Sequence, residues 1–198
     1  MNKLLIKILF FFLLTGCGER TFTANEFVEY IKNESNNYKL VTVADPLVYT
    51  VQYKPVEYVV LSEAENESLT TELFKTRMEE LKGYYYFDFV LSPEKKPDNL
   101  LNVFKLKDQE LIHYLSYDIK HDFSLINEAD TLSPELCHYE RSVSGVYRFS
   151  LLYERPLENS EFTFVFDDLL TGYGPVKFQF KNNILNNAVQ LNLKRVNL

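Results

Sequence analysis

Two segments in the C-terminal half carry an apolar side chain at every second position. Residues 162–166 read Phe-Thr-Phe-Val-Phe, and residues 176–180 read Val-Lys-Phe-Gln-Phe. In a strand, this period of two turns one apolar face towards a core. Similar short segments recur about every ten residues, which is typical of an immunoglobulin-like or related Greek-key β-sandwich. The strands expected on this basis are 111–117, 122–126, 136–141, 146–153, 162–166, 176–180 and 189–193.

The part of the chain before this region begins with three apolar runs that are rich in valine. Asp45-Pro46 and Lys54-Pro55 separate these runs, and the residue before a proline favours extended or turn conformations. A run of aromatic residues follows further along the chain and ends at Ser92-Pro93. The strands expected here are 40–44, 47–53, 56–61 and 84–91.

One segment of this part has a helix pattern instead. From Leu69 to Leu81, apolar residues recur three and four positions apart, which is the period of an amphipathic helix. Asn66 or Ser68 is expected to cap its N-terminus, and Gly83 stands where a left-handed C-cap belongs.

Residues 1–16 have the pattern of a cleaved secretory signal. A positive n-region precedes the apolar residues 8–14, a stretch well below the roughly 20 residues that a membrane-spanning helix needs. The stretch closes with Leu-Thr-Gly-Cys, which resembles the bacterial lipobox and predicts lipidation of Cys17. Each buried methylene contributes about 0.8 kcal/mol and two acyl chains anchor stably. An ordinary signal peptide with an unmodified Cys17 is the alternative.

Residues 17–35 are expected to form a lipidated tether and a short helix. Thr23 and Glu26 have the spacing of a capping box. Phe27 and Ile31 lie four positions apart and share one face of the expected helix. We expect this helix to cover one end of the core; a helix that faces a partner or the membrane is the alternative.

The composition favours strands and excludes one class of partner. Phe and Tyr make up 15% of the chain, and pleated, half-buried surfaces favour such rings. Removal of residues 1–16 takes away Lys3 and Lys7, so the formal charge falls from -7 to -9. Nucleic-acid binding needs a face rich in lysine and arginine, so we expect no nucleic-acid partner.

Together these patterns predict an α+β fold that is mostly β. Residues 36–98 are expected to form an α+β N-terminal part with strands and one or two helices, and residues 99–198 the β-sandwich. Residues 36–198 as one domain is the alternative arrangement. Such a length suits either organisation.

Motifs for catalysis or metal binding are missing from the sequence. His113, His121 and His138 stand in no zinc-binding spacing, and the chain has no Gly-x-Ser-x-Gly elbow or phosphate-binding loop. Asp167-Asp168 after a strand fits a turn better than a calcium site. We therefore predict no catalytic residue, no metal and no cofactor, although carboxylates that folding brings together leave no sequence motif.

Three short segments are candidates for interaction surfaces. Tyr84, Tyr85 and Tyr86 either form part of a strand or offer a platform for sugars or peptides. Glu140-Arg141 is either a structural ion pair at a strand end or part of a binding rim. Cys137, three positions before Glu140, is expected to point inwards from a strand as a buried thiol.

Several segments together resemble uncharacterised lipoproteins of the Bacteroidota. They are the lipobox, residues 53–58 (Tyr-Lys-Pro-Val-Glu-Tyr), residues 137–141 (Cys-His-Tyr-Glu-Arg), residues 166–168 (Phe-Asp-Asp) and residues 174–180 (Gly-Pro-Val-Lys-Phe-Gln-Phe). The resemblance covers nearly the whole chain and implies a lipid-anchored protein of the outer membrane. Whether it faces the periplasm or the cell surface stays open, and the resemblance implies no catalytic residue.

The sequence thus predicts a noncatalytic envelope lipoprotein that acts as a protein-interaction or structural component of a cell-envelope assembly. Its expected partners are the membrane, through the lipid on Cys17, and another protein. The alternative is a glycan- or peptide-binding, or hydrolytic, envelope lipoprotein, which the Tyr84–Tyr86 run favours.

Overall fold

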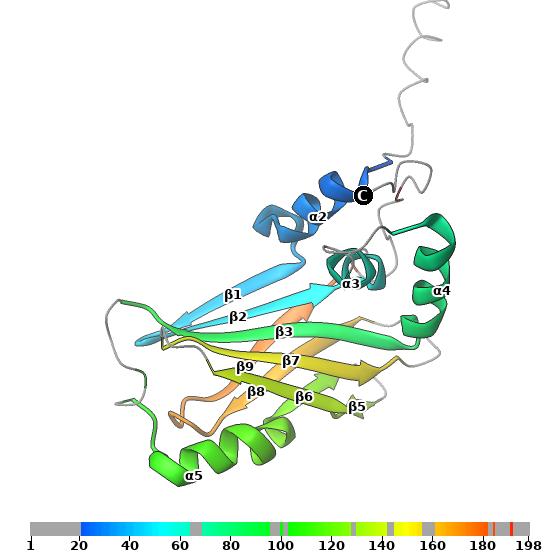
Figure 1. Ribbon diagram of the computed structural model, residues 1–198. Coiled ribbons are helices and arrows are strands. Elements are labelled where there is room, and N and C mark those ends of the chain that lie inside the picture. Colours follow the sequence, from blue (N-terminus) through cyan, green and yellow to red (C-terminus); the bar gives the residue numbers. More distant parts are fainter. Residues whose placement is uncertain are drawn as a thin grey trace, which may run out of the picture.

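Two antiparallel sheets form the body of the protein. The computed structural model describes residues 21–63, 69–95, 100, 103–127, 130–141, 145–155, 161–181, 184 and 191. The first sheet has the order β1-β2-β3-β7-β6 and the second has the order β5-β4-β8-β9 (Figure 1). The strands of the first are β1 Lys39–Ala44, β2 Leu47–Lys54, β3 Tyr84–Pro93, β6 Leu136–Arg141 and β7 Tyr147–Glu154. Those of the second are β4 Phe123–Ile126, β5 Thr131–Leu132, β8 Phe162–Asp168 and β9 Gly174–Phe180.

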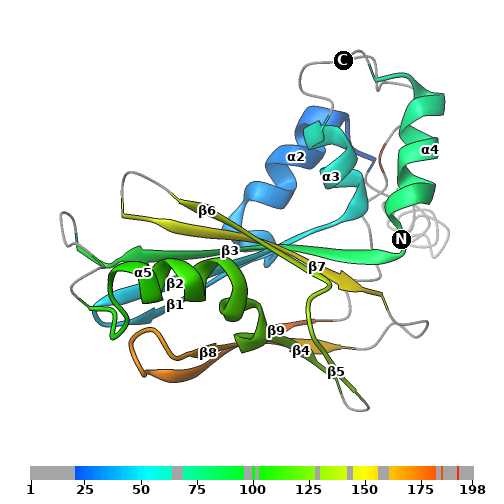
Figure 2. The same cartoon turned by 60° about the horizontal axis from the view of Figure 1, so that its bottom comes forward.

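The helices lie in two groups around this body (Figure 2). The helices α2 Ala24–Lys32, α3 Val56–Glu63 and α4 Thr71–Leu81 gather at the end where β2 ends and β3 begins, with the short 3-10 turn η2 Glu34–Asn36 after α2. A second group, α5 Asp108–His113, the π-helical turn η4 Tyr114–Asp118 and the 3-10 turn η5 Ile119–Asp122, leads into β4. Within the described ranges, no helix combines the length and apolarity of a membrane-spanning segment.

Aromatic rings fill the space between the two sheets. Phe89 at the centre of β3 is fully buried, and its ring centroid lies 4.7 Å from that of Phe166 on β8. Phe87 on β3 lies 5.4 Å from Phe164 in the same way. Pairs of this kind contribute about 0.5–1.5 kcal/mol beyond the burial of their area. The sheets therefore share one core, which fixes them face to face as a sandwich.

The mostly-β α+β class that the sequence predicts is confirmed. The sandwich differs from the expected one in its composition, because β3 from residues 36–98 pairs along its length with β7 from residues 99–198. Residues 99–198 supply the whole second sheet and two strands of the first. The five-stranded sheet therefore contains strands from both sides of residue 98, and the second sheet packs against it.

The expected helix near the N-terminus is confirmed as α2. The Thr23 hydroxyl accepts from the amide of Glu26 at 3.3 Å, and the Glu26 carboxylate accepts from the amide of Thr23 at 2.9 Å. These two bonds complete the capping box. Phe27 and Ile31 are fully buried, so α2 covers an end of the core.

Two expected strands are helices. Residues 56–61 belong to α3, which buries Val56, Val60 and Leu61, because a short continuous apolar run does not distinguish a strand from a buried helix. Pro55 starts this helix instead of separating two strands, since proline is tolerated in a first helical turn. Residues 111–117 lie in α5 and η4, where Leu111, Tyr114 and Leu115 are buried at helical spacing.

The ends of α4 also differ from the prediction. Thr70 caps its N-terminus, since its hydroxyl accepts from the amide of Leu73 at 3.2 Å, whereas Asn66 and Ser68 lie outside the described residues. The C-cap is Lys82 in the right-handed region. The prediction of a left-handed C-cap at Gly83 is wrong. Among the described glycines, those with a positive φ are Gly145, Gly172 and Gly174. Most of the expected strand 189–193 also lies outside the described residues.

Candidate interaction face on the five-stranded sheet

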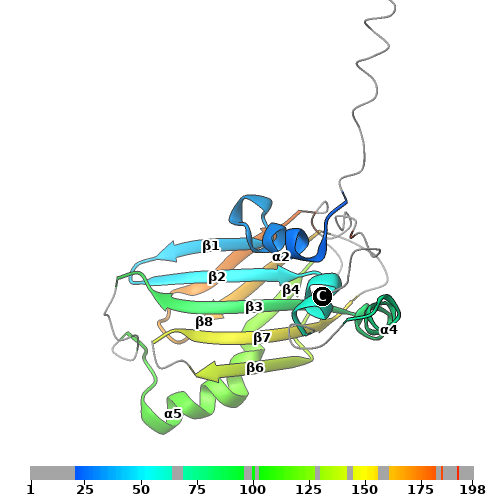
Figure 3. The same ribbon diagram turned by 45° about the horizontal axis from the view of Figure 1, so that its top comes forward.

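The strands of the five-stranded sheet turn alternate side chains away from the core. On β3, Tyr85, Phe87, Phe89 and Leu91 are buried against the second sheet, so the residues between them point to the other side, which Figure 3 shows from the front. We name this side the outer face. Its residues are Lys39, Val41, Val43, Val48, Thr50, Gln52, Lys54, Tyr84, Tyr86, Asp88, Val90, Ser92, Leu136, His138, Glu140, Arg148, Ser150, Leu152 and Glu154.

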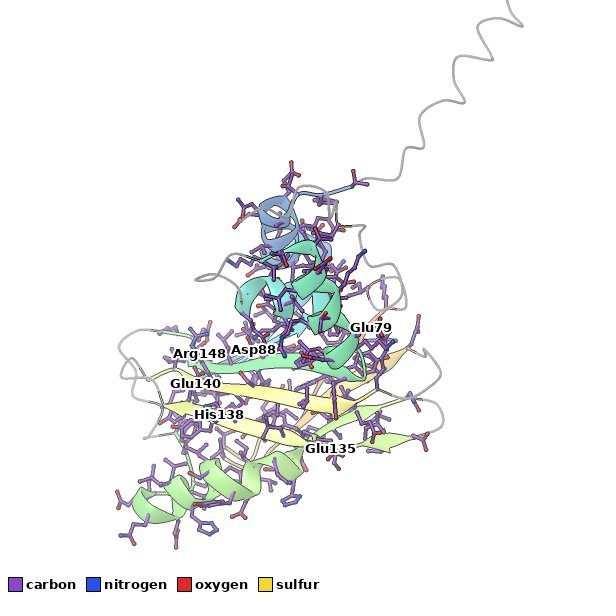
Figure 4. The ribbon with its side chains drawn as sticks, turned by 45° about the vertical axis from the view of Figure 1, so that its right-hand side comes forward. Glu79, Asp88, Glu135, His138, Glu140 and Arg148 are labelled. Atoms are coloured by element: carbon purple, nitrogen blue, oxygen red, sulfur yellow. The ribbon has the colours of Figure 1, made fainter. Side chains whose placement is uncertain are left out.

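Charges alternate in sign from strand to strand across the outer face. Lys54 on β2, Asp88 on β3, Arg148 on β7 and Glu140 on β6 follow one another across the sheet. Figure 4 labels the last three of these residues. Lys54 forms an ion pair with Asp88, whose side chains are 25% and 32% exposed. Glu140 stands directly opposite Arg148 in the register of β6 and β7. We name these four residues the charge row.

A second set of polar residues crosses the same strands. Asp88, Ser150 and His138 are register partners on β3, β7 and β6, and the Ser150 hydroxyl donates to Asp88 Oδ1 at 3.1 Å. In a nucleophilic triad the carboxylate orients the histidine and the histidine accepts from the serine. Here the serine stands between the other two and donates to the carboxylate. The order of the three residues therefore does not fit that chemistry.

Apolar side chains occupy two opposite corners of the outer face. Val41 and Val43 on β1 are 47% and 57% exposed, and Leu136 on β6 is 57% exposed. Leu152 on β7 is the register partner of Leu136 and is half-buried. These valine and leucine side chains expose apolar area to water. Apolar residues that are grouped on one surface mark contact sites more often than isolated ones do.

Helix α4 limits another corner of the outer face. The Tyr86 hydroxyl donates to the carbonyl of Leu81 at the C-terminal end of α4, at 3.3 Å. This bond holds the end of α4 beside the start of β3. The open part of the outer face therefore extends from there towards the hairpin between β1 and β2 (Figure 3).

The tyrosines of the Tyr84–Tyr86 run point in two directions. Tyr84 is 36% exposed, Tyr86 is half-buried on the outer face, and Tyr85 is 1% exposed in the core. Arg155 covers the Tyr85 ring, with Cζ 5.0 Å from the ring centroid. The strand prediction for this run is confirmed, and the three rings do not form one platform.

Glu140 and Arg141 both lie on β6, where their register partners are Arg148 and Tyr147. Glu140 is exposed on the outer face. The structure thus brings Glu140 next to Arg148, which the sequence analysis did not single out. No local signal connects the two, because a residue separation of eight becomes a contact only through the register of β6 and β7.

The structure describes one of the two cysteines. Cys17 lies outside the described residues. Cys137 is a free thiol on β6 that packs against the core, as expected of an inward-pointing side chain, but it is half-buried where the sequence predicted a buried thiol. Burial raises the pKa of the Cys137 thiol to about 12, which keeps it protonated and unreactive near neutral pH.

Asp168 is a buried charged residue at the end of β8. Its Oδ2 accepts from the Tyr49 hydroxyl at 2.6 Å, its Oδ1 accepts from the amide of Thr171 at 3.0 Å, and the Thr171 hydroxyl also donates to it. Because Tyr49 lies on β2, the first bond connects the two sheets. The turn predicted at Asp167-Asp168 is confirmed, with Asp168 as its anchor.

A second carboxylate near this turn is Asp122, which accepts from the Tyr114 hydroxyl. Burial raises the pKa of Asp122, the hydrogen bond from Tyr114 lowers it, and the charges of Asp167 and Asp168 raise it further. Among the described residues, no three His, Cys, Asp or Glu side chains are grouped so that they could hold a metal ion.

A groove of about 680 Å³ lies beside α2. The ring centroids of Phe22 and Tyr30 are 5.1 Å apart in its wall. Several of its polar atoms already bind the chain itself, since Asn36 Nδ2 donates to the carbonyl of Tyr30 and Asn33 Oδ1 accepts from the amide of Ser35. Its lining residues are Thr21, Phe22, Glu26, Glu29, Tyr30, Lys32, Asn33 and Asn36.

Comparisons with known proteins include a distant structural similarity. No family model matches the sequence, and no curated protein matches it. A crystal structure of a DUF4426 family protein from Pseudomonas aeruginosa is similar over 71% of this chain and 92% of that chain, with 10% sequence identity and a TM-score of 0.39.

Proposed function

We propose that this chain is a noncatalytic, lipid-anchored protein of the outer membrane whose folded part is a protein-interaction or structural component of a cell-envelope assembly. The observation that carries the proposal is the Leu-Thr-Gly-Cys sequence at residues 14–17, directly after an apolar run. Lipid at Cys17 would hold the sandwich at the membrane surface.

The position of the first described residue supports this arrangement. Thr21 follows Cys17 by four residues, which span at most about 14 Å when fully extended. The group α2–α4 therefore stands nearest the lipid. The outer face runs along the strands away from that end (Figure 3), so it stays accessible to another protein beside the anchor.

The outer face, as an open sheet surface, supports a protein partner better than a small substrate. Binding sites for small molecules are concave and enclose most of the ligand, whereas the charge row lies on a sheet surface. Its residues come from four adjacent strands and are held by the sheet hydrogen bonds. A rigid array of charges of both signs gives orientation and specificity to a protein contact.

The anchor is tested by replacing each cysteine in turn. We expect Cys17→Ser to move the protein from the detergent-extracted membrane fraction to the soluble fraction and to remove the acyl mass from its N-terminus. The matched variant Cys137→Ser is expected to keep both the anchor and the acyl mass. A wild-type protein with an unmodified Cys17 would contradict the proposal.

The interaction is tested in living cells with a photo-crosslinking amino acid. At position 138, on the outer face, it is expected to give a defined crosslinked protein product. At position 177, an exposed lysine on β9 of the other sheet, it serves as the matched control and is expected to give none. Equal products at both positions would argue against a specific outer face.

A glycan- or peptide-binding lipoprotein is a second candidate, which the groove beside α2 favours. Its volume of about 680 Å³ falls within the range of ligand sites, about 300–1,000 Å³. The ring of Tyr30 is the side chain there that could stack on a sugar. Calorimetric titration with envelope oligosaccharides and peptides, using Tyr30→Ala against Tyr84→Ala, tests this candidate; heat that both variants retain would exclude the groove.

A further inference from the structure

We infer that the outer face binds the outer face of a second copy of this chain, in a dimer with two-fold symmetry. The inference rests on the proposed function as an interaction protein and names the partner. It depends on the pattern of charge and apolar side chains over the outer face, and it needs no lipid.

The charge row is complementary to its own reverse. From β2 to β6 the signs run positive at Lys54, negative at Asp88, positive at Arg148 and negative at Glu140. When a second row is laid over it in the opposite direction, every charge meets one of the other sign. A two-fold axis reverses the direction in this way. If residue i of one copy contacts residue j of the second copy, residue j of the first copy contacts residue i of the second.

The register fixes where such an axis runs. Lys54, Asp88 and Arg148 lie on successive rows of the pleat as the sheet is crossed, and Glu140 lies on the same row as Arg148, so the charge row runs obliquely across the outer face. We refer to this oblique direction as its diagonal. A two-fold axis in the plane of contact, perpendicular to this diagonal, brings Asp88 opposite Arg148 of the second copy. It also brings Lys54 opposite the second copy's Glu140. The strands of the two copies then cross near a right angle, which is one of the two usual ways in which sheets pack.

The apolar corners agree with the same axis. The corner with Val41 and Val43 and the corner with Leu136 and Leu152 lie at the two ends of the other diagonal. A rotation about that diagonal returns each corner to itself. Valine therefore covers valine, and leucine covers leucine, while the charges pair between them. One axis satisfies both kinds of side chain.

The size of the outer face is sufficient for a stable contact. Five strands about 4.8 Å apart and eight residues that rise about 3.3 Å each give a flat area of about 600 Å², and projecting side chains add to it. A standard protein interface buries about 800 Å² on each partner. The outer face is therefore of the size that a stable dimer needs.

The overall charge limits which surfaces of two copies can meet. Two copies of the mature chain, each with a formal charge of -9, repel one another at most surfaces. The outer face instead carries the cations Lys39, Lys54 and Arg148 with the carboxylates Asp88, Glu140 and Glu154. Because three cations balance three carboxylates, contact through the outer face avoids that repulsion.

The test measures the dimer dissociation constant of the mature lipidated chain in detergent, by analytical ultracentrifugation over a series of concentrations. Arg148→Asp puts two carboxylates opposite each other in both halves of the contact, and Asp88→Arg puts two cations there. Either change is expected to raise the dissociation constant at least about tenfold. The double variant Asp88→Arg with Arg148→Asp restores opposite charges and is expected to recover most of the affinity.

Controls separate this result from unfolding and from the anchor. Lys177→Glu, on the far sheet, is expected to leave the dissociation constant unchanged, and circular dichroism of the aromatic core checks that each variant is folded. A monomer at all concentrations, or a dimer that Arg148→Asp leaves intact, would overturn the inference. Cys17→Ser is expected to abolish anchoring and keep the dimer, so failure of the lipid proposal and failure of the dimer are distinct results.

Discussion

The two faces of the five-stranded sheet are built from the same strands and have opposite chemistry. On β3, Phe87 and Phe89 are buried against rings of the second sheet, while Asp88, between them, belongs to the charge row. The inner face gains stability from burial, at about 25 cal/mol for each Å² of apolar area. The outer face gains little stability, because ion pairs at partly exposed sites contribute about 0–1 kcal/mol. The proposed dimer would give these charges a role that folding stability does not.

The largest effect is expected from a change to the inner face. Phe89→Ala removes a ring that packs against Phe123, Phe149, Phe164 and Phe166. We expect the free energy of unfolding to fall by about 3–5 kcal/mol in urea denaturation. The matched change Val90→Ala, on the outer face of the same strand, is expected to cost about 1 kcal/mol or less. Equal losses would break the distinction between the faces.

The anchor between the sheets comes next. Asp168→Ala leaves the Tyr49 hydroxyl and the Thr171 amide without their acceptor in a buried place. We expect a loss of about 1–3 kcal/mol in the free energy of unfolding. Asp167→Ala, on the exposed neighbour, is the control and is expected to change it by about 0.5 kcal/mol or less. If Asp168→Ala left the free energy of unfolding unchanged, the hydrogen bonds of Asp168 would not contribute to holding the two sheets together.

A glycine in the turn after Asp168 sharpens the comparison further. Gly172 has a φ of +76°, and an added Cβ would lie 1.8 Å from Lys105 Nζ. Gly172→Ala is expected to lower stability by about 1–2 kcal/mol, because of backbone strain and the displacement of that lysine. Gly83→Ala, where nothing lies within 4 Å of the added atom, is expected to be neutral or slightly stabilising. Urea denaturation of both glycine variants measures the difference.

The smallest effect concerns pH. Burial raises the pKa of Asp122 in the folded protein, so the folded state keeps this proton to a higher pH than the unfolded chain does. The contribution of Asp122 to stability is therefore complete below the unfolded value, about 3.9, and declines as pH rises through the raised pKa. Asp122→Asn is expected to remove this decline from a pH series of urea melts, and Asp130→Asn, at an exposed site, to retain it. A decline that Asp122→Asn leaves unchanged would assign it to another group.

The sequence predicts the inner face well because its signal is local. The alternation in residues 162–166 and 176–180 needs only neighbouring residues to be recognised, and the capping box of Thr23 and Glu26 lies within four residues. Local patterns also explain the wrong prediction of a strand at residues 56–61. A continuous apolar run has no periodicity that distinguishes a strand from a buried helix.

The outer face has no such signal. Lys54, Asp88, Glu140 and Arg148 lie on four strands and meet only through the register between them. Each of these residues alone reads as an ordinary exposed charge on a strand. The pattern that matters, the change of sign from one strand to the next, exists only once β3 has paired with β7. The sequence therefore identifies Glu140 as a candidate and leaves out Arg148, its register partner.

The most direct test of a stability face and an association face on one sheet is the molar mass of the double charge swap compared with its two single variants. The mass of Asp88→Arg and that of Arg148→Asp should correspond to monomer, and that of the combined variant to dimer, while the circular dichroism of the aromatic core shows that all of them are folded. Monomer for the unaltered chain, or one mass shared by all four proteins, would contradict this division of roles.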